Sequence, residues 1–341
     1  MEQLERSVVQ LTEARRLAEF EDVPHGRLAL LLLDNAAEVS LQRSAQTHLT
    51  RADWYGTMAA NLLDADVTPD AEGLQFLRQI VPMTISKRQQ RQVERSYESL
   101  VDYVFAQEHY DLPVEFGECL KILHRYRNAA YHRDDVQAEV LGPAVSILFF
   151  LCCHLLAAEQ QIFHEINVAP ASVLAVFGDS PPQTTWPGPG GIGFDSSSLG
   201  RLAAERLLLD SALDHDGVAR ALSRHLIGRL ARLEHDLDYI GESIPPGVNR
   251  AATLRLVQLA PKDREDFNTE PPSDFWIRPL PVSEAMLGDW KGAALAIVDT
   301  TDAVSALTAF GDIEARLEEL EEPVGRFLED IDRMEDEASG R

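Results

Sequence analysis

The sequence predicts an all-α protein: an N-terminal helical bundle at residues 1–167, a linker at 168–200 and a mainly helical C-terminal region at 201–341. Apolar residues recur at three- and four-residue steps over most of the chain, as they do in amphipathic helices. Residues 177–200 are rich in Gly, Pro and Ser, which interrupt helices. The 341 residues are 45% hydrophobic and 26% charged. This composition is typical of a soluble globular chain with one or two domains.

The first predicted helix carries a polar patch on an apolar background. Residues 24–48 begin with Pro24 and are apolar on most sides, which predicts a buried helix. Asp34, Asn35 and Glu38 interrupt this apolar surface. Because buried polar groups without partners cost free energy, we expect these side chains to have partners.

Three further helices complete the predicted bundle. Residues 86–110 are expected to form one helix with Ser86 as its N-cap. Pro113 is well placed to start the next helix. The last helix is expected from about residue 136 to 167, and residues 142–143, Gly-Pro, can bend it.

Beyond the linker the helical spacing returns. Residues 201–240 predict two helices separated near 214–217. Residues 245–281 contain seven prolines and are expected to be mostly irregular, with a strand-like segment at 253–259. From Ser283 onward the chain is again helical in pattern and ends in a strongly acidic tail. That tail is expected to be a solvated amphipathic helix, and the alternative is an acidic arm that binds a partner or the chain itself.

Charge and cysteine usage restrict the function classes. The net charge of -25 excludes a broad basic surface for nucleic acid. Cys119, Cys152 and Cys153 show no metal-ligand or CxxC spacing, which indicates reduced thiols. The longest apolar run, residues 144–158, is short for a membrane span and contains His154. We therefore expect a cytoplasmic protein with no membrane partner.

Residues 123–135, LHRYRNAAYHRDD, place a polar cluster directly before the last apolar helix of the bundle. Four residues separate Arg127 from His132, and the same spacing occurs twice more in the chain without an amide after the Arg. Here Asn128 follows the Arg directly, and Tyr131 precedes the His. The surroundings, more than the spacing, single out this segment.

These residue types suit RNA cleavage without a metal. That reaction needs a base for the ribose 2′-OH, an acid for the leaving 5′-oxygen and a cation for the phosphorane charge. His132 titrates near neutrality and suits proton transfer. Arg127 suits the phosphorane because its planar fork matches two phosphate oxygens. Asn128 would orient the His or the scissile phosphate, and a second proton-transfer group is expected.

The segment RYRNAAYHRDD resembles the motif of the HEPN superfamily, whose ribonuclease members carry an Arg, a polar residue that is often Asn, a short spacer and a His near the end of a core helix. The resemblance covers about residues 20–165. It implies a metal-independent endoribonuclease that needs no cofactor, cuts cellular or phage RNA as a toxin or defence effector, and leaves 2′,3′-cyclic phosphate ends.

The resemblance also implies partners. In that family two copies face each other, so Arg127 and His132 of both chains of a homodimer would form one composite site. An antitoxin or another defence component is a further implied partner. Some members carry a Tyr two positions after the His, which an adenylylating antitoxin modifies. Asp134 stands at that position here, so this class of antitoxin is not implied.

Several helper residues are weighed beside the motif, namely Asp34, Asn35, Glu38, His124 and Tyr131. The three from the first helix either pack beside the motif and fix Arg127 or form an unrelated polar face. His124 is either a second proton donor or a surface histidine. A further set could contact RNA phosphates or form a solvated helix face: Lys87, Arg88, Arg91 and Arg133, with Arg95 on the same helix as the first three.

Two other function classes stay open. One is a noncatalytic HEPN-like module that binds RNA or a nucleotide through Arg127 and His132. The other is a helical scaffold or interaction protein, in which Arg127 pairs with a carboxylate and His132 caps a helix. A metal site is not predicted, because residues 233–238, LEHDLD, lack the spacing of a metal-binding helix and a second ligand cluster.

Overall fold

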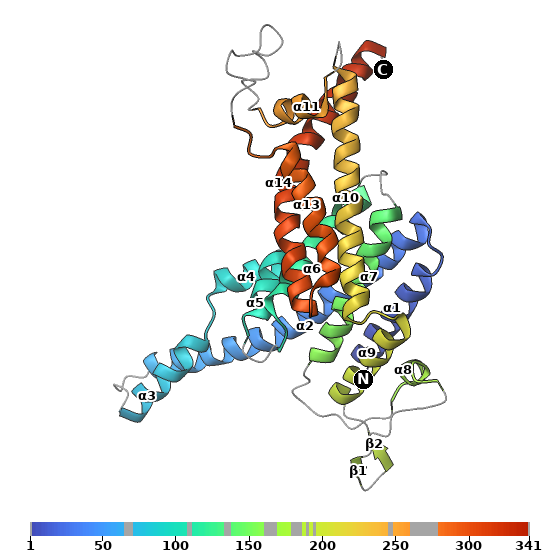
Figure 1. Cartoon of the computed structure of the whole chain (residues 1–341). Helices are drawn as coiled ribbons and strands as arrows, with labels where there is room; N and C mark the ends of the chain where they lie inside the picture. Colours follow the sequence, from blue (N-terminus) through green and yellow to red (C-terminus); the bar gives the residue numbers. More distant parts are fainter. Residues whose placement is uncertain are drawn as a thin grey trace. The chain divides into compact units, whose positions relative to one another are not determined.

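The computed structural model describes residues 2–64, 71–107, 111–132, 138–159, 169–178, 186–188, 191–193, 196–244, 248–259 and 279–339. The fold is all-α, as predicted, and the described residues include one short two-stranded hairpin (Figure 1). The chain divides into two compact units. Unit 1 comprises Met1–Asp135 and Leu148–Asp214, and unit 2 comprises Val136–Ile147 and His215–Arg341.

Helix α7 (Ala138–Ala158) contributes its first half to unit 2 and its second half to unit 1. The other described elements of unit 1 are α1 (Glu2–Ala18), α2 (Val23–Asp64), α3 (Ala71–Ile80), η1 (Val81–Met83), α4 (Lys87–Arg95), α5 (Tyr97–Phe105), α6 (Val114–His132), α8 (Ala171–Ala175), β1 (Trp186–Gly188), β2 (Gly191–Gly193) and α9 (Ser196–Ser211). Those of unit 2 are α10 (His215–Ser243), α11 (Arg250–Val257), α13 (Glu284–Ala296), η2 (Ile297–Asp299) and α14 (Ala303–Ser339).

The core of unit 1 forms around α2, which packs against α1, α5 and α6. Leu33 and Leu41 of α2 and Leu120 and Leu123 of α6 are all fully buried. Each buried leucine contributes roughly 2 kcal/mol. Gly117 of α6 allows a close approach to α5, because an added Cβ would lie only 3.1 Å from a side-chain carbon of Val101. Helix α6 is thereby held close to α5.

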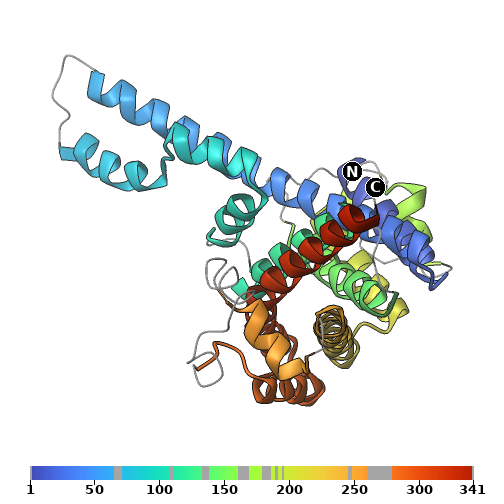
Figure 2. The same cartoon turned by 90° about the horizontal axis from the view of Figure 1, so that it is seen from above.

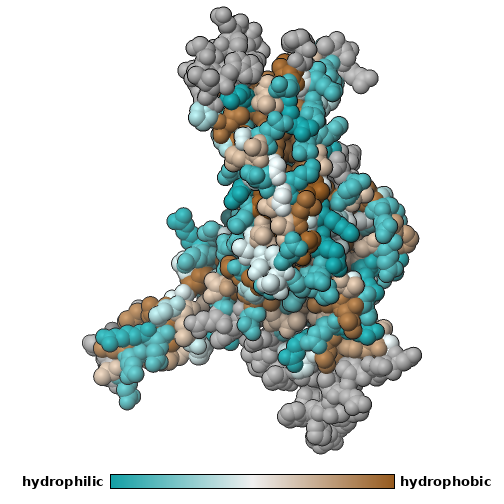
Figure 3. Space-filling view, in the orientation of Figure 1, coloured by the Kyte–Doolittle hydropathy of each residue, from teal (hydrophilic) through white to brown (hydrophobic). Residues whose placement is uncertain are grey.

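The second half of α2 forms an arm (residues 50–64 and 71–95) with α3, η1 and α4, and Figure 2 shows α3 running back alongside the end of α2. Its small core consists of Ala59, Leu77 and Ile80, with three half-buried residues packed on it: Tyr55, Met58 and Leu62. The surface of the arm is mixed, with hydrophobic and hydrophilic residues side by side in Figure 3. Trp54 and Leu63 are among its exposed apolar side chains.

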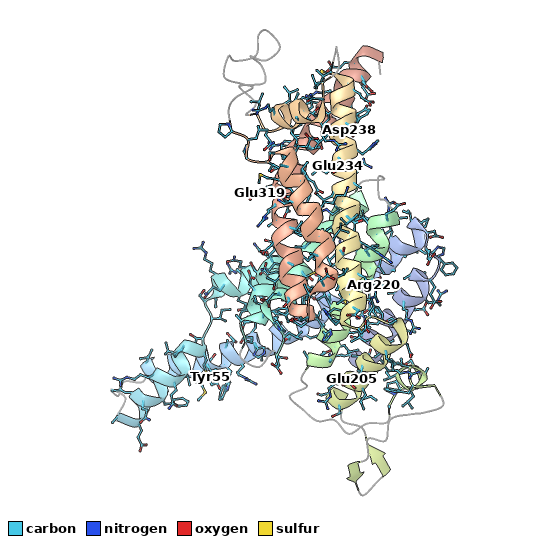
Figure 4. All side chains as sticks on the ribbon, viewed as in Figure 1. Tyr55, Glu205, Arg220, Glu234, Asp238 and Glu319 are labelled. Atoms are coloured by element: carbon cyan, nitrogen blue, oxygen red, sulfur yellow. The ribbon has the colours of Figure 1, made fainter. Side chains whose placement is uncertain are left out.

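Unit 2 is a helical bundle in which α10 packs against α13 and α14 (Figure 1). Its core includes Leu226 and Leu230 of α10 and Phe310 and Leu317 of α14. At the far end of α10, Arg250 of α11 pairs with Asp238, which Figure 4 labels. The apolar periodicity of these long helices explains the bundle, since each buries one stripe.

A charge network lies inside this bundle. Glu314 is 3% exposed and forms ion pairs with His225 and Arg229. Burial alone would raise the pKa of Glu314, but the Arg229 charge and the His225 contacts outweigh it and lower the pKa to about 2. Glu321 is the second partner of Arg229, and the two carboxylates raise the pKa of that guanidinium despite its burial. The buried carboxylate is therefore ionised.

Several predicted boundaries agree with the structure. Ser86 caps α4 in a capping box with Gln89, and Ser283 caps α13. Helix α6 begins directly after Pro113, and α9 and α10 are separated at residues 212–214. The acidic tail from residue 312 continues α14.

Other boundaries differ. The helix expected at 24–48 extends to Asp64. The helix expected at 86–110 is two helices, because Ser96 adopts an extended conformation and its side chain caps α5. The segment at 253–259, expected to be strand-like, lies largely in α11, which Asn249 caps. Helix α9 begins inside the predicted linker and belongs to unit 1.

The long apolar helix α7 continues through Pro143. By length and composition it is the one described helix apolar enough to cross a membrane. However, 72% of its apolar window is buried inside the protein. A buried core helix, as the sequence predicts, has this property, and a soluble protein is consistent with it.

Candidate functional site

The predicted motif lies on the last turns of α6. Arg127 and Asn128 are on the penultimate turn, and His132 is the final helical residue. The side chain of His132 and the whole of Arg133 lie outside the described residues. Leu120 and Leu123 are fully buried one turn before His124 and Arg127, so the face of α6 that carries these polar residues packs on the core of unit 1.

Asp34 of α2 joins two residues of this face. One carboxylate oxygen, Oδ1, lies 2.9 Å from Nδ1 of His124, and the other, Oδ2, lies 2.7 Å from Nη2 of Arg127. His124 and Arg127 are three residues apart, so they share a face of α6. Asp34 is only 1% exposed. An ionised carboxylate at that depth needs such partners, which explains how a core helix tolerates this residue.

Arg127 is held at two of its nitrogens. Besides the pair with Asp34, its Nη1 donates a hydrogen bond of 2.6 Å to the side-chain oxygen of Asn128. The contact with Asp34 is an ion pair, and the bond to Asn128 uses one of the five N–H donors of the guanidinium. The side chain is 25% exposed, while Nε is buried with no hydrogen-bond acceptor among the described residues. The guanidinium is therefore positioned, with donors left for a ligand.

Tyr97 covers His124. The two rings stack with centroids 3.9 Å apart and planes 9° from parallel. The Tyr97 hydroxyl is buried without a hydrogen-bond partner in the part of the chain that the structure describes. Burial raises the pKa of Tyr97, and the negative charge of Asp34 raises it further. Tyr97 thus stays a neutral phenol that fixes the plane of the His124 ring.

Tyr97 is a site residue that the sequence did not indicate as one. In the single helix predicted at 86–110, Tyr97 is one of the apolar residues at helical spacing, with no indication of a role in the site. The break at Ser96 places Tyr97 in the first turn of α5 instead, where α5 meets α6. The sequence signal for this break is Ser96, a residue type that commonly caps helices: its side-chain oxygen accepts a hydrogen bond from the backbone N–H of Ser99.

The other predicted helper residues lie in different places. Asn35 is exposed and accepts a hydrogen bond of 2.8 Å from Gln10 of α1, so it is turned away from the motif. Glu38 lies one turn beyond Asp34 and accepts a bond of 2.9 Å from Gln42. Tyr131 is 65% exposed. Of the three polar residues of α2, Asp34 is the one that contacts the described part of the motif.

The predicted RNA-contact residues of α4 form an exposed basic face: Lys87, Arg88, Arg91 and Arg95. They stand at helix positions that share one side of α4. None forms an ion pair with a carboxylate among the described residues. A basic face without internal partners is available to an anionic ligand.

The cysteines do not supply a nucleophile to this site. All three are buried free thiols. Cys152 donates its S–H to the carbonyl oxygen of Leu33 over 3.3 Å, directly beside Asp34. Burial raises the pKa of Cys152 and of Cys153, which keeps both as neutral thiols.

Among the described residues, no group of three or more His, Cys, Asp or Glu side chains is placed to hold a metal ion. No family model, curated protein or solved structure matches this chain. In the described part of the chain, the end of α6 with its partners on α2 and α5 offers a fixed cation, a neighbouring amide and the imidazole of His124.

Proposed function

We propose that this protein is a metal-independent endoribonuclease of the HEPN type, acting as a toxin or antiphage-defence effector. The observation that carries the proposal is the position of Arg127, which the buried carboxylate of Asp34 and the amide of Asn128 hold at the polar end of α6. A preorganised cation near a histidine is what phosphodiester cleavage without a metal requires.

In this reaction His132 takes the proton of the ribose 2′-OH, and the 2′-oxygen attacks the phosphorus. The phosphorane carries extra negative charge, which the remaining N–H donors of Arg127 stabilise. The P–O5′ bond then breaks, the 5′-oxygen takes a proton from a second acid, and a 2′,3′-cyclic phosphate is left. His132 of a second copy supplies that acid in a homodimer, as the family resemblance implies.

His124 serves as a positioning residue in this proposal. Its Nδ1 is engaged by Asp34, and Tyr97 covers one face of its ring. The side chain is 18% exposed. Its role is to share the charge of Asp34 with Arg127 and to fix the carboxylate between α2 and α6.

A noncatalytic RNA- or nucleotide-binding module is the second candidate. The exposed basic face of α4 favours it, because four cations that have no carboxylate partner within the described segments can bind phosphates whether or not cleavage follows. In that case Arg127 and His132 would hold a phosphate without transferring a proton.

The deciding experiment is cleavage of labelled total RNA in excess EDTA by the wild type, His132→Ala and Arg127→Ala at matched oligomeric state. Arg6→Ala and His235→Ala are matched controls, since both residues are exposed and lie outside the motif. We expect 2′,3′-cyclic phosphate ends from the wild type and both controls, and a loss of at least about 100-fold in the two motif variants.

Two results would go against the ribonuclease. Equal cleavage by the wild type and both motif variants would remove Arg127 and His132 from the chemistry. Absence of cleavage by the wild type, together with RNA binding that weakens as salt rises, would favour the noncatalytic module. Circular dichroism of each variant shows whether the fold is intact, and Arg127→Lys keeps the positive charge beside Asp34.

A further inference from the structure

A groove of about 770 Å³ opens in unit 1, separate from the contacts of Asp34. Its walls come from α2, the end of α3, η1, α4 and α5. Tyr55, which Figure 4 labels on α2, and Tyr103 of α5 both line it and are half-buried. A groove of this size is large enough for one or two nucleotides.

The lining is rich in amides. Gln79, Gln89, Gln92 and Gln107 all face the groove. Gln89 is used in the cap of α4, and Gln107 donates to the backbone of Tyr103. Gln79 and Gln92 are exposed, and the side-chain amide of neither forms a hydrogen bond in the described part of the chain. Each offers a donor and an acceptor, the pair that an unpaired base edge also presents.

The charge of the groove is unlike that of the whole chain, whose net charge is -25. Asp102 of α5 is the one carboxylate among the lining residues, and it forms an ion pair with Lys121, which also pairs with Glu118. Arg51 adds a half-buried cation on the α2 wall. On α4, Arg88 is one turn before Gln92, so the exposed basic face adjoins the groove along that edge.

We propose that this groove binds unpaired bases of single-stranded RNA. The rings of Tyr55 and Tyr103 provide stacking surfaces, the amides of Gln79 and Gln92 contact base edges, and Arg51 with the basic face of α4 contacts phosphates. This inference deepens the proposed function, on which it rests, by naming single-stranded RNA as the substrate class. An A-form duplex keeps its bases stacked and would not offer them to the tyrosines.

The test is fluorescence anisotropy with a labelled single-stranded 2′-O-methyl oligonucleotide, which cannot be cleaved because its 2′-oxygen is blocked. Arg51→Glu and Gln92→Glu alter the groove. Arg78→Glu and Gln75→Glu are matched controls, because both residues are exposed on α3 and neither lines the groove. We expect at least about a tenfold rise in Kd for each groove variant and less than about threefold for each control.

Equal binding by the groove variants and the wild type would overturn the proposal, as would equal affinity for a duplex of the same sequence. Gln92 is exposed, so its replacement reports on binding without disturbing the core. Binding of acidic peptides in place of the oligonucleotide would assign the groove to a protein partner and would also overturn it.

A parallel cleavage assay separates this proposal from the ribonuclease. If the wild type binds the oligonucleotide through the groove but cuts no RNA, the groove stands and the catalytic proposal fails. If the wild type cuts RNA and the groove variants bind as it does, the catalytic proposal stands and the groove fails. A raised KM with unchanged kcat in the groove variants supports both.

Discussion

Replacing Asp34 with Ala removes the one carboxylate that His124 and Arg127 share. Breaking a buried ion pair by removing one partner costs about 3–5 kcal/mol, because the other charge is left without compensation. Arg127 is 25% exposed and His124 is 18% exposed, so water can reach both side chains after the change. We therefore expect a loss of about 2–3 kcal/mol in the free energy of unfolding.

Urea unfolding followed by circular dichroism measures this loss, and Asp53→Ala, an exposed aspartate of the same helix, is the control. A double-mutant cycle with Arg127→Ala isolates the pair, with an expected coupling of about 1–3 kcal/mol. The m-value should stay constant, which shows that the change is in stability. A loss below about 1 kcal/mol in Asp34→Ala, or additive effects in the cycle, would refute the argument.

Three further outcomes concern stability. The pKa of Glu314 in the folded state is about 2, below its ordinary value, so its ionised form stabilises the fold. This stabilisation is fully present above about pH 4.5 and is lost as the pH falls toward 2. In urea unfolding at a series of pH values, Glu314→Gln should therefore flatten the dependence of stability on pH in this range. Gly241→Ala would place a Cβ 2.7 Å from the Val248 carbonyl oxygen and should lower the free energy of unfolding by about 1–3 kcal/mol. Gly288 has open space around it, so Gly288→Ala is the control and should not destabilise the protein. Thermal melts of both variants test this difference. Ser86→Ala removes the N-cap of α4 and should lower the free energy of unfolding by about 1 kcal/mol. Calorimetry measures the expected fall in Tm, and an unchanged Tm would contradict the role of the cap.

The sequence was sufficient to predict that Asp34 needs a partner, but not which partner it has. A carboxylate within a buried apolar helix requires a partner, because burying an unpaired charge costs free energy. His124 and Arg127 lie about 90 positions away, and their contact with Asp34 depends on the packing of α2 against α6. The periodicity of one sequence shows which side of each helix is apolar, but it does not show which helices pack against each other.

The misjudged boundaries share a physical cause. Residues 253–259 are a short apolar run, in which helix and strand patterns are hard to distinguish. The side chain of Asn249 accepts a hydrogen bond from the backbone N–H of Ala252, and this N-cap favours a helix over a strand. Ser96 does the same within the predicted helix at 86–110. Local caps, more than apolar spacing, set where these elements begin.

The boundary between the two units does not coincide with the predicted linker. A stretch rich in Gly and Pro interrupts helices, but it does not determine which core the following helix joins. Helix α9 buries Leu199, Ala203 and Leu207 in unit 1, although it begins near the end of the predicted linker and most of it lies beyond. In the same way, α7 is one continuous helix that supplies residues to both units.

The net charge of -25 makes local attraction a requirement for any RNA-directed function of this chain. At long range the protein repels a polyanion, and screening weakens that repulsion beyond about 10 Å at ordinary salt. A substrate must then be held by cations that are close to it and not neutralised from within. Asp34 already neutralises part of the charge of Arg127, so this residue positions a phosphate better than it attracts one. The exposed cations of α4 have no such carboxylate partner among the described residues. In the proposed ribonuclease, attraction and chemistry would therefore belong to different elements of unit 1, α4 and α6, and a variant could lose either one while it keeps the other.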